Sequence, residues 1–375
     1  MIYRKYVKPV LATGIICILF GCTNEKDKKE ITVDNEPLNV ILMIGDGMGV
    51  PQISTAYYFG DREANFSQFD NIGFHQTADK SSLITDSAAG ATAFATGKKT
   101  YKRAIGVDQD TVPQQTILEY LKGQDYLTGL ISLTTITHAT PAAFYAHVKD
   151  RDMHDEIAEQ LTNAGVDFIA GGGRKYFKDR KDSINLFDRF KGSGYNLDTT
   201  ALTNPDYDKR NAFIISDEGL PSKIEGRKDF LKDATLKALD YFEKNNKPFF
   251  MMVEGSYIDW GGHAENEEML VSELEDFDET LGAVIDYVRS HPNTLLVVTA
   301  DHETGGVSIG KYYDTDDTSG KKTEVNDRVK VYFNSDQHSG ELIPVFAMGT
   351  GSERFRGIYQ NNEIQHKMMD ALKNE

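Results

Sequence analysis

Three hydrophobic runs of this sequence end in side chains that bind metal ions. The candidates are Asp46 after residues 40–44, Glu254 after residues 250–253, and Asp301 with His302 after residues 295–299. In an open α/β sheet, ligands bind at the carboxyl ends of the strands, so these side chains would share one edge. Carboxylate oxygens and imidazole nitrogens are suitable zinc ligands. Taken alone, Asp46 between two glycines is equally compatible with an ordinary turn.

Asp259, His263 and His338 extend this set of candidate ligands. Asp259 and His263 are four residues apart, which places them on one face if the stretch is helical. His338 precedes the last hydrophobic run of the chain. A lone histidine is usually structural, but three of the nine histidines lie close to predicted strand ends and beside acids. This concentration favours a site with more than one metal ion.

Ser87 is the candidate nucleophile. It precedes a run of small residues, from Ala88 to Ala93, that predicts a tightly packed helix. Ser87 would then lie at a helix N-terminus, where free N–H groups favour an anion. The alternative is that Ser87 or Asp86 serves only as an N-cap. A serine hydroxyl needs a base or a metal ion to become nucleophilic, and two ions about 4 Å apart can assist an in-line phosphoryl displacement.

The elements that would position these residues follow an α/β pattern, because short hydrophobic runs alternate with longer amphipathic stretches. The predicted strands are residues 39–44, 127–134, 166–170, 249–254, 294–299 and 343–348. The predicted helices, whose hydrophobic residues recur at helical spacing, are residues 114–121, 152–163, 229–246, 267–289 and 363–372. Residues 175–228 and 311–337 have weaker periodicity and are predicted to be irregular insertions.

The composition constrains the partners. A formal net charge of −17 argues against nucleic acid, because neutralising its phosphates requires clustered Lys and Arg. Hydrophobic residues at 39% and charged residues at 26% are close to ordinary globular values, so a packed body of enzyme size is expected. An acidic protein that binds an anionic substrate needs local positive charge, which metal ions supply compactly.

The N-terminus has the features of a secretion signal. Three basic residues precede a hydrophobic run at residues 10–20, and Cys22 follows a glycine. Residues 1–21 are therefore predicted to be a signal peptide, with cleavage before Cys22 and lipidation of its sulfur. An uncleaved signal anchor is the less favoured alternative. We expect export across the inner membrane and a lipid-anchored periplasmic or cell-surface protein, with residues 22–37 as a tether and 38–375 as the folded domain.

Six local motifs resemble those of alkaline phosphatases and occur in the order of that family. They are Ile44-Gly45-Asp46-Gly47-Met48-Gly49, Thr85-Asp86-Ser87-Ala88-Ala89, Thr137-His138-Ala139-Thr140-Pro141-Ala142-Ala143, Val253-Glu254-Gly255, Ala300-Asp301-His302-Glu303-Thr304-Gly305-Gly306 and His338-Ser339-Gly340-Glu341. Six ordered matches are far more specific than one. The resemblance spans residues 39–348 and implies a three-layer sandwich with a large, mostly parallel central sheet flanked by helices.

The resemblance also implies two zinc ions and one magnesium ion. One zinc would be held by Asp259, His263 and His338, and the second by Asp46, Asp301 and His302. The magnesium ligands would be Asp46, Thr140 and Glu254, which are all hard oxygen donors.

By the same resemblance, Ser87 attacks the phosphorus of a small phosphate monoester, and the resulting phosphoserine is hydrolysed by water. Arg151 would grip two phosphate oxygens, a bidentate contact that suits a planar guanidinium. The alternative for Arg151 is a surface ion pair with the acids on either side of it.

Three features depart from relatives within the family. His138 stands where some relatives have a carboxylate near the magnesium, so it would act through water at most and could admit zinc there. Trp260 stands where some relatives have a basic residue, so weaker retention of phosphate is expected. Relatives carry a larger insertion at residues 311–337 that contributes to dimer contacts, which leaves a homodimer open.

The alternatives to a phosphomonoesterase are an enzyme of a neighbouring family and a protein without catalytic activity. A sulfatase would need an oxidisable Cys or Ser in its own motif, and phosphodiesterases often use Thr as the nucleophile. Cofactor-independent phosphoglycerate mutases share the scaffold. A lipoprotein that only binds phosphate or zinc would need no nucleophile, whereas Ser87 is present with the complete ligand set. Ser87, Thr140 and Glu254 together favour a monoesterase.

Overall fold

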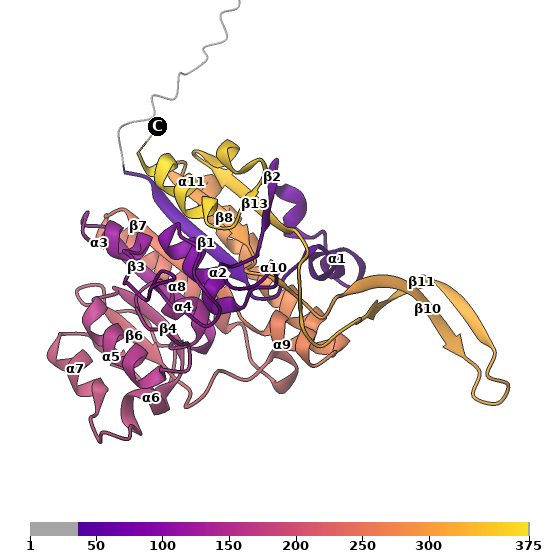
Figure 1. Cartoon of the computed structure of the whole chain (residues 1–375), viewed down its shortest axis with the longest axis horizontal. Coiled ribbons are helices and arrows are strands. Elements are labelled where there is room, and N and C mark those ends of the chain that lie inside the picture. Colours follow the sequence, from indigo (N-terminus) through magenta and orange to yellow (C-terminus); the bar gives the residue numbers. More distant parts are fainter. Residues whose placement is uncertain (1–36, 374–375) are drawn as a thin grey trace, which may run out of the picture. The chain divides into compact units, whose positions relative to one another are not determined.

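The computed structural model describes residues 37–373, so the predicted signal peptide, Cys22 and the tether up to residue 36 lie outside the described residues. The described chain contains a ten-stranded sheet in the order β14-β2-β13-β8-β1-β7-β3-β4-β6-β5 (Figure 1). The strands are β1 (Asn39–Gly45), β2 (Asn71–Gln76), β3 (Leu127–Thr135), β4 (Phe168–Gly172), β5 (Asn196–Asp198), β6 (Asn211–Ile214), β7 (Phe249–Gly255), β8 (Thr294–Thr299), β13 (Ile343–Gly349) and β14 (Gly357–Gln360). β13 is antiparallel to both of its neighbours, and the other pairs in this sheet are parallel.

Helices cover both faces of the sheet because its central strands are hydrophobic on both sides. In β1, Val40 and Leu42 pack on one face, and Ile41 and Met43 pack on the other. The helices are α1 (Val50–Tyr58), α2 (Ser87–Thr96), α3 (Ile117–Lys122), α4 (Ala139–Ala142), α5 (His154–Ala164), α6 (Arg174–Lys178), α7 (Leu186–Gly192), α8 (Phe230–Asn245), α9 (Tyr257–His263), α10 (Glu267–Ser290) and α11 (Glu363–Leu372). Residues of α2, α3, α5, α7 and α11 join the first core, and residues of α1, α8 and α10 join the second. The predicted three-layer α/β sandwich is confirmed.

The six predicted strands and five predicted helices are all present, with small differences at their ends. The largest concerns α3, which begins at Ile117 rather than at Gln114. The Thr116 side chain accepts a hydrogen bond from the Glu119 N–H, and the Glu119 carboxylate accepts one from the Thr116 N–H. This capping box sets the start of the helix.

The two predicted insertions are more regular than expected. Residues 175–228 include β5 and β6, which extend the central sheet, together with α7. The expectation of irregular structure at residues 311–337 was wrong, because β10 (Ser308–Thr315) and β11 (Lys322–Tyr332) form an antiparallel hairpin. Most of its residues are exposed, so neither strand needs the alternating hydrophobic pattern from which strands are predicted.

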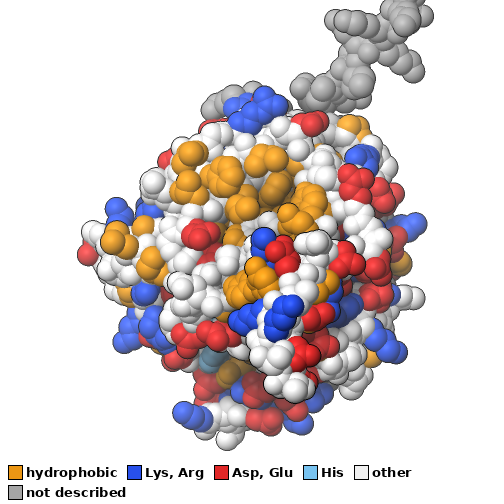
Figure 2. Space-filling model, turned by 90° about the vertical axis from the view of Figure 1, so that its right-hand side faces the viewer, with side chains coloured by type: hydrophobic (Ala, Val, Ile, Leu, Met, Phe, Trp, Pro, Cys, Tyr) orange, Lys and Arg blue, Asp and Glu red, His pale blue; other side chains and the backbone are white. Residues whose placement is uncertain are grey.

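The hairpin extends away from the sheet and helices (Figure 1). Viewed from the side of the hairpin, acidic side chains are scattered among Lys and Arg, and hydrophobic side chains gather on one part of this face (Figure 2). Among the described residues, no helix has both the length and the hydropathy needed to span a membrane.

Candidate metal centre and nucleophile

Four adjacent strands supply one edge of the sheet with metal-binding side chains. β8, β1, β7 and β3 are neighbours in the sheet, and their parallel register brings their carboxyl ends together. Asp301 follows β8, Asp46 follows β1, Glu254 lies near the end of β7, and Thr140 lies in α4 just after β3. Residues that are up to 255 positions apart in the sequence therefore share one site because of the strand order.

The first ligand group consists of Asp46, Asp301 and His302. The His302 Nε2 atom lies 3.5 Å from the nearest carboxylate oxygen of each aspartate, and all three side chains are fully buried. Both carboxylate oxygens of Asp46 and Oδ2 of Asp301 have no hydrogen-bond partner among the described residues. Buried polar atoms are nearly always paired, so these orphaned oxygens fit a bound cation. The donor set of two carboxylates and an imidazole suits zinc.

The second group consists of Asp259, His263 and His338. The α9 helix places Asp259 and His263 one turn apart on one face, as the spacing predicts. The Nε2 atoms of the two histidines are 3.2 Å apart and lie 3.4 Å and 3.6 Å from Oδ1 of Asp259. Three ligand atoms thus converge on one point.

Hydrogen bonds on the far side of both rings set their tautomers. Nδ1 of His263 lies 2.6 Å from the Asp336 carbonyl oxygen, and Nδ1 of His338 lies 2.9 Å from the Thr85 carbonyl oxygen. A carbonyl can only accept, so each Nδ1 carries the proton and each Nε2 is left as a lone-pair donor. This is the arrangement expected of metal-binding histidines.

The two groups adjoin each other. The rings of His302 and His338 stack with centroids 3.5 Å apart. Ligand atoms of Asp259, His302 and His338 also lie within 4.8 Å of one another. The six residues therefore form a single centre made of two adjoining ligand groups.

A third group lies on the other side of Asp46 and contains Glu254, Thr140 and His138. Ligand atoms of Asp46, His138 and Glu254 lie within 4.8 Å of one another. The Thr140 hydroxyl and Oε1 of Glu254 are buried without a hydrogen-bond partner among the described residues, whereas Ser132 donates to Oε2 of Glu254 at 2.6 Å. Oxygen donors of this kind suit magnesium.

His138 is held neutral in this group. Burial, together with the charge of Arg151, holds its pKa well below the ordinary value. Nε2 lies 3.1 Å from Nη2 of Arg151, and a guanidinium can only donate, so Nε2 accepts and Nδ1 carries the proton. Nδ1 is buried without a hydrogen-bond partner among the described residues, so it could bind a metal ion only in the other tautomer, in which Nε2 no longer accepts from Arg151.

Ser87 begins α2 and is only 3% exposed. Its Oγ lies 3.3 Å from Nε2 of His302, which places the hydroxyl against the first ligand group. Asp86 is the N-cap, because its side chain accepts from the Ala89 N–H. The capping role therefore falls to Asp86, and the Ser87 hydroxyl remains directed at the candidate ligands.

A glycine permits this approach. A Cβ atom on Gly90 would lie 3.0 Å from Cβ of Asp301, which is tighter than ordinary packing. The small residues of α2 thus let the helix bring Ser87 close to the strand end that carries Asp301.

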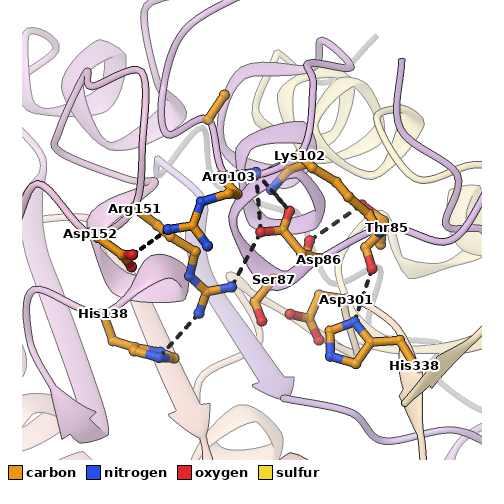
Figure 3. A network of polar contacts seen from close by, with 12 residues as sticks. Thr85, Asp86, Ser87, Lys102, Arg103, His138, Arg151, Asp152, Asp301 and His338 are labelled. Atoms are coloured by element: carbon orange, nitrogen blue, oxygen red, sulfur yellow. Dashed lines mark hydrogen bonds and ion pairs between the residues drawn. The ribbon is translucent and has the colours of Figure 1, made fainter. Parts of the chain in front are cut away.

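Arg151 points into the site rather than toward its sequence neighbours (Figure 3). Nη1 donates to Oδ2 of Asp86 at 3.3 Å, and Nη2 donates to His138. The flanking acids Asp150 and Asp152 instead bind Arg103. Among the described residues, the ion pair of Arg151 is therefore with Asp86, and the predicted alternative of an ion pair with the flanking acids is not formed.

Trp260 follows Asp259 on α9 and is 42% exposed. Its ring packs edge-on against Tyr257, with centroids 4.7 Å apart.

The sequence patterns indicated no role for Ser132 or Thr304, which hydrogen bond to Glu254 and Asp259 respectively. Ser132 lies within a hydrophobic run, so its type and position carry no signal that it contacts Glu254.

Without a cation, burial and mutual repulsion make the ionised forms of the acids in the centre unfavourable. Burial is the main cause of the raised pKa of Asp46, followed by the charges of Asp301 and Asp259. Burial likewise raises the pKa of Glu254 to about 7, against an ordinary value of 4.5. A bound cation would remove this penalty.

The Glu254 shift predicts a pH dependence of stability in the metal-free protein. Because the folded-state pKa is the higher one, the folded state binds more protons than the unfolded state between pH 4.5 and about 7. Stability therefore falls as the pH rises through this window. We expect Glu254→Gln to remove that contribution. From pH 4.5 to pH 7, the free energy of unfolding of the variant should therefore rise relative to that of the parent, by roughly 3 kcal/mol at most.

The measurement is denaturant unfolding of chelator-treated protein at pH 4.5 and pH 7. The exposed Glu265 provides the control variant Glu265→Gln. A stability difference between Glu254→Gln and the parent that is the same at both pH values would contradict the expectation.

Comparisons with known proteins show the family to which the chain belongs. The sequence model of the alkaline phosphatase family matches residues 38–315 and 311–374. Alkaline phosphatase 3 of Bacillus subtilis (strain 168) is 34% identical, with 98% of each chain covered. The structure of alkaline phosphatase from the Antarctic bacterium TAB5 superimposes with a TM-score of 0.86 at 43% identity, covering 90% of this chain and 98% of that one. On the family match and these relatives, the chain belongs to the alkaline phosphatase family.

Proposed function

We propose that the protein hydrolyses phosphate monoesters through a phosphoserine on Ser87, at a centre that holds two zinc ions and one magnesium ion. Membership of the alkaline phosphatase family supports the monoesterase activity itself. The observation that carries the finer proposal is the buried Ser87 hydroxyl, which lies 3.3 Å from His302 beside orphaned carboxylate oxygens.

The two imidazole-containing groups are the proposed zinc sites. Asp46, Asp301 and His302 would hold one ion, and Asp259, His263 and His338 would hold the other. When bound, zinc acts as a Lewis acid that favours the ionised seryl oxygen and stabilises the oxygen of the departing alcohol.

Magnesium is the proposed occupant of the third group, with Asp46, Thr140 and Glu254 as ligands. Structures of TAB5 alkaline phosphatase with a histidine mutated to Asp or Glu have Mg bound in the M3 site. In this chain His138 is part of the third group. A neutral His138 contributes no charge, so we propose that it acts through water and that the site can also admit zinc.

The chain's own groups account for the bond changes. The Ser87 hydroxyl gives up its proton and its Oγ attacks phosphorus, forming the seryl ester while the bond to the alcohol oxygen breaks and that oxygen takes up a proton. Water then attacks the phosphoserine, which releases inorganic phosphate and restores the hydroxyl. Arg151 is proposed to hold two phosphate oxygens, and the N-terminus of α2 adds a favourable dipole.

The proposal is tested by comparing hydrolysis of a chromogenic phosphate monoester with that of the matching diester and sulfate. The assay uses mildly alkaline pH with zinc and magnesium present. We expect rapid turnover of the monoester alone. Preference for the diester or the sulfate would move the protein to a neighbouring family, and absence of turnover by metal-loaded protein would favour a phosphate-binding or zinc-binding lipoprotein.

We also propose that the protein is exported across the inner membrane and anchored as a periplasmic or cell-surface lipoprotein through Cys22. In cells fed radiolabelled palmitate, Cys22→Ser is expected to abolish labelling, because the sulfur is the site of lipid attachment. Cys17→Ser is the matched control, since Cys17 lies within the predicted signal peptide. Labelling that persists in Cys22→Ser would contradict the proposal.

We also propose that the protein forms a homodimer. The exposed β10–β11 hairpin and the hydrophobic side chains gathered on the face in Figure 2 are compatible with an interface. Light scattering of the purified protein would give the number of copies directly.

A further inference from the structure

Arg103 adopts a backbone conformation that is unfavourable for its residue type. Its φ angle is 72°, in the left-handed region that glycine occupies most easily. Such strain persists only where the surroundings stabilise it, and it is enriched at functional sites. Arg103 lies beside the proposed phosphate site (Figure 3), so its surroundings need explanation.

The backbone and side chain of Arg103 connect two parts of that site. Its N–H donates to both carboxylate oxygens of Asp86, the residue before Ser87. Its guanidinium donates to Asp150 through Nε and Nη2, both at 2.8 Å, and Nη2 also contacts Asp152. One residue therefore links the start of α2 to the segment that carries Arg151.

These ion pairs are poorly explained by stability alone. The side chains of Arg103, Asp150 and Asp152 are all substantially exposed, and exposed ion pairs contribute little to folding. The Arg103 hydrogen bonds nevertheless lower the pKa of Asp150 to about 2, because they favour its ionised form.

The same contacts decide which partner Arg151 has. Asp150 and Asp152 flank Arg151 in the sequence, and Arg103 engages both of their carboxylates. With Arg103 bound to both, the Arg151 guanidinium donates to Asp86 and His138 instead. Arg103 also places a positive charge against the two acids, which reduces their repulsion of a phosphate dianion bound at Arg151.

We propose that Arg103 is a positioning residue that occupies the two acids beside Arg151 and thereby keeps Arg151 available for phosphate. The inference rests on the proposed phosphate-binding role of Arg151. It assigns Arg103 no contact with the substrate.

The first test replaces Arg103 with glycine, which removes the side chain but suits the positive φ angle. The hydrogen bonds from the backbone N–H to Asp86 can remain, so the fold should be retained. We expect the inhibition constant for inorganic phosphate and the KM for a phosphate monoester to rise about tenfold, which is typical of losing part of a charge-assisted contact. The thermal midpoint should stay the same or rise. Thr111→Gly, at an exposed residue with φ of 62°, is the matched control for glycine at a positive φ.

The second test asks whether phosphate binding is restored when the two flanking acids are removed together with Arg103. In Arg103→Gly/Asp150→Asn/Asp152→Asn, neither residue that flanks Arg151 in the sequence is an acid and Asp86 is unchanged, so phosphate inhibition should return to near the parent value. Arg103→Lys keeps the charge without the two-pronged geometry and should be intermediate. A triple variant that still binds phosphate weakly would overturn the proposal, because Arg103 would then act directly on phosphate or only as scaffolding.

Arg151→Ala is measured alongside with the same phosphate inhibition assay. If its inhibition constant equals that of the parent, the proposed role of Arg151 fails. If Arg151→Ala weakens phosphate binding and Arg103→Gly does not, only the role of Arg103 fails.

Discussion

Ser87→Ala is expected to lower kcat for a phosphate monoester by about a thousandfold or more, because it removes the atom that forms the covalent intermediate. The side chain is 3% exposed and small, so the substitution leaves little space unfilled and the fold should be retained. The residual rate would come from water attacking phosphate that is still bound and oriented at the centre. Steady-state kinetics with a chromogenic monoester measure the loss.

Acid quenching with labelled substrate provides a second readout, because the parent should retain label on the protein and Ser87→Ala should not. Ser290→Ala is the control, since Ser290 is exposed at the end of α10 and precedes β8, at the opposite end of the sheet from the site. A variant without Ser87 that keeps near-parental kcat and still retains label would exclude Ser87 as the nucleophile.

Removal of the metal ions is expected to abolish turnover and to lower the thermal midpoint by several degrees. Without cations, burial raises the pKa values of Asp46, Asp301 and Glu254, and the charge of Asp301 further raises those of Asp46 and Glu254. A ligand present at a thousandfold excess over its Kd stabilises the folded state by about 4 kcal/mol. Calorimetry and activity before and after chelation measure both effects.

Metal analysis of Asp301→Asn makes this prediction specific. The amide is nearly isosteric with the carboxylate but is a neutral and weaker ligand, so we expect loss of about one zinc ion per chain and at least a hundredfold loss of activity. Asp327→Asn, on the exposed β11 strand, is the control. Full activity of the chelated protein, or an unchanged zinc content in Asp301→Asn, would disprove the proposed centre.

Much of this site was predictable from the order of residue types along the chain. Hydrophobic runs that are buried on both faces predict parallel strands, and the polar residues that end them must meet at one sheet edge. Asp46, Glu254, Asp301 and His302 were recognisable for that reason. The four-residue spacing of Asp259 and His263 similarly predicted one helical face, which α9 provides.

Several features of the same site depended on contacts that no local pattern encodes. The tautomers of His263 and His338 are set by carbonyl groups of Asp336 and Thr85, and the latter is 253 residues away from its partner. Ser132 reaches Glu254 because β3 and β7 are paired.

The β10–β11 hairpin was not predicted because its strands are exposed. Without a buried face, their sequences do not need to alternate hydrophobic and polar residues. The partners of Arg151 were equally undetermined by sequence, since adjacent acids offered a local ion pair. Arg103, brought close by the fold, binds those acids instead. The sequence thus determined which residues could do the chemistry, through periodicity and strand ends. Tertiary structure decided their hydrogen-bond partners, because those depend on distances between segments that are remote along the chain.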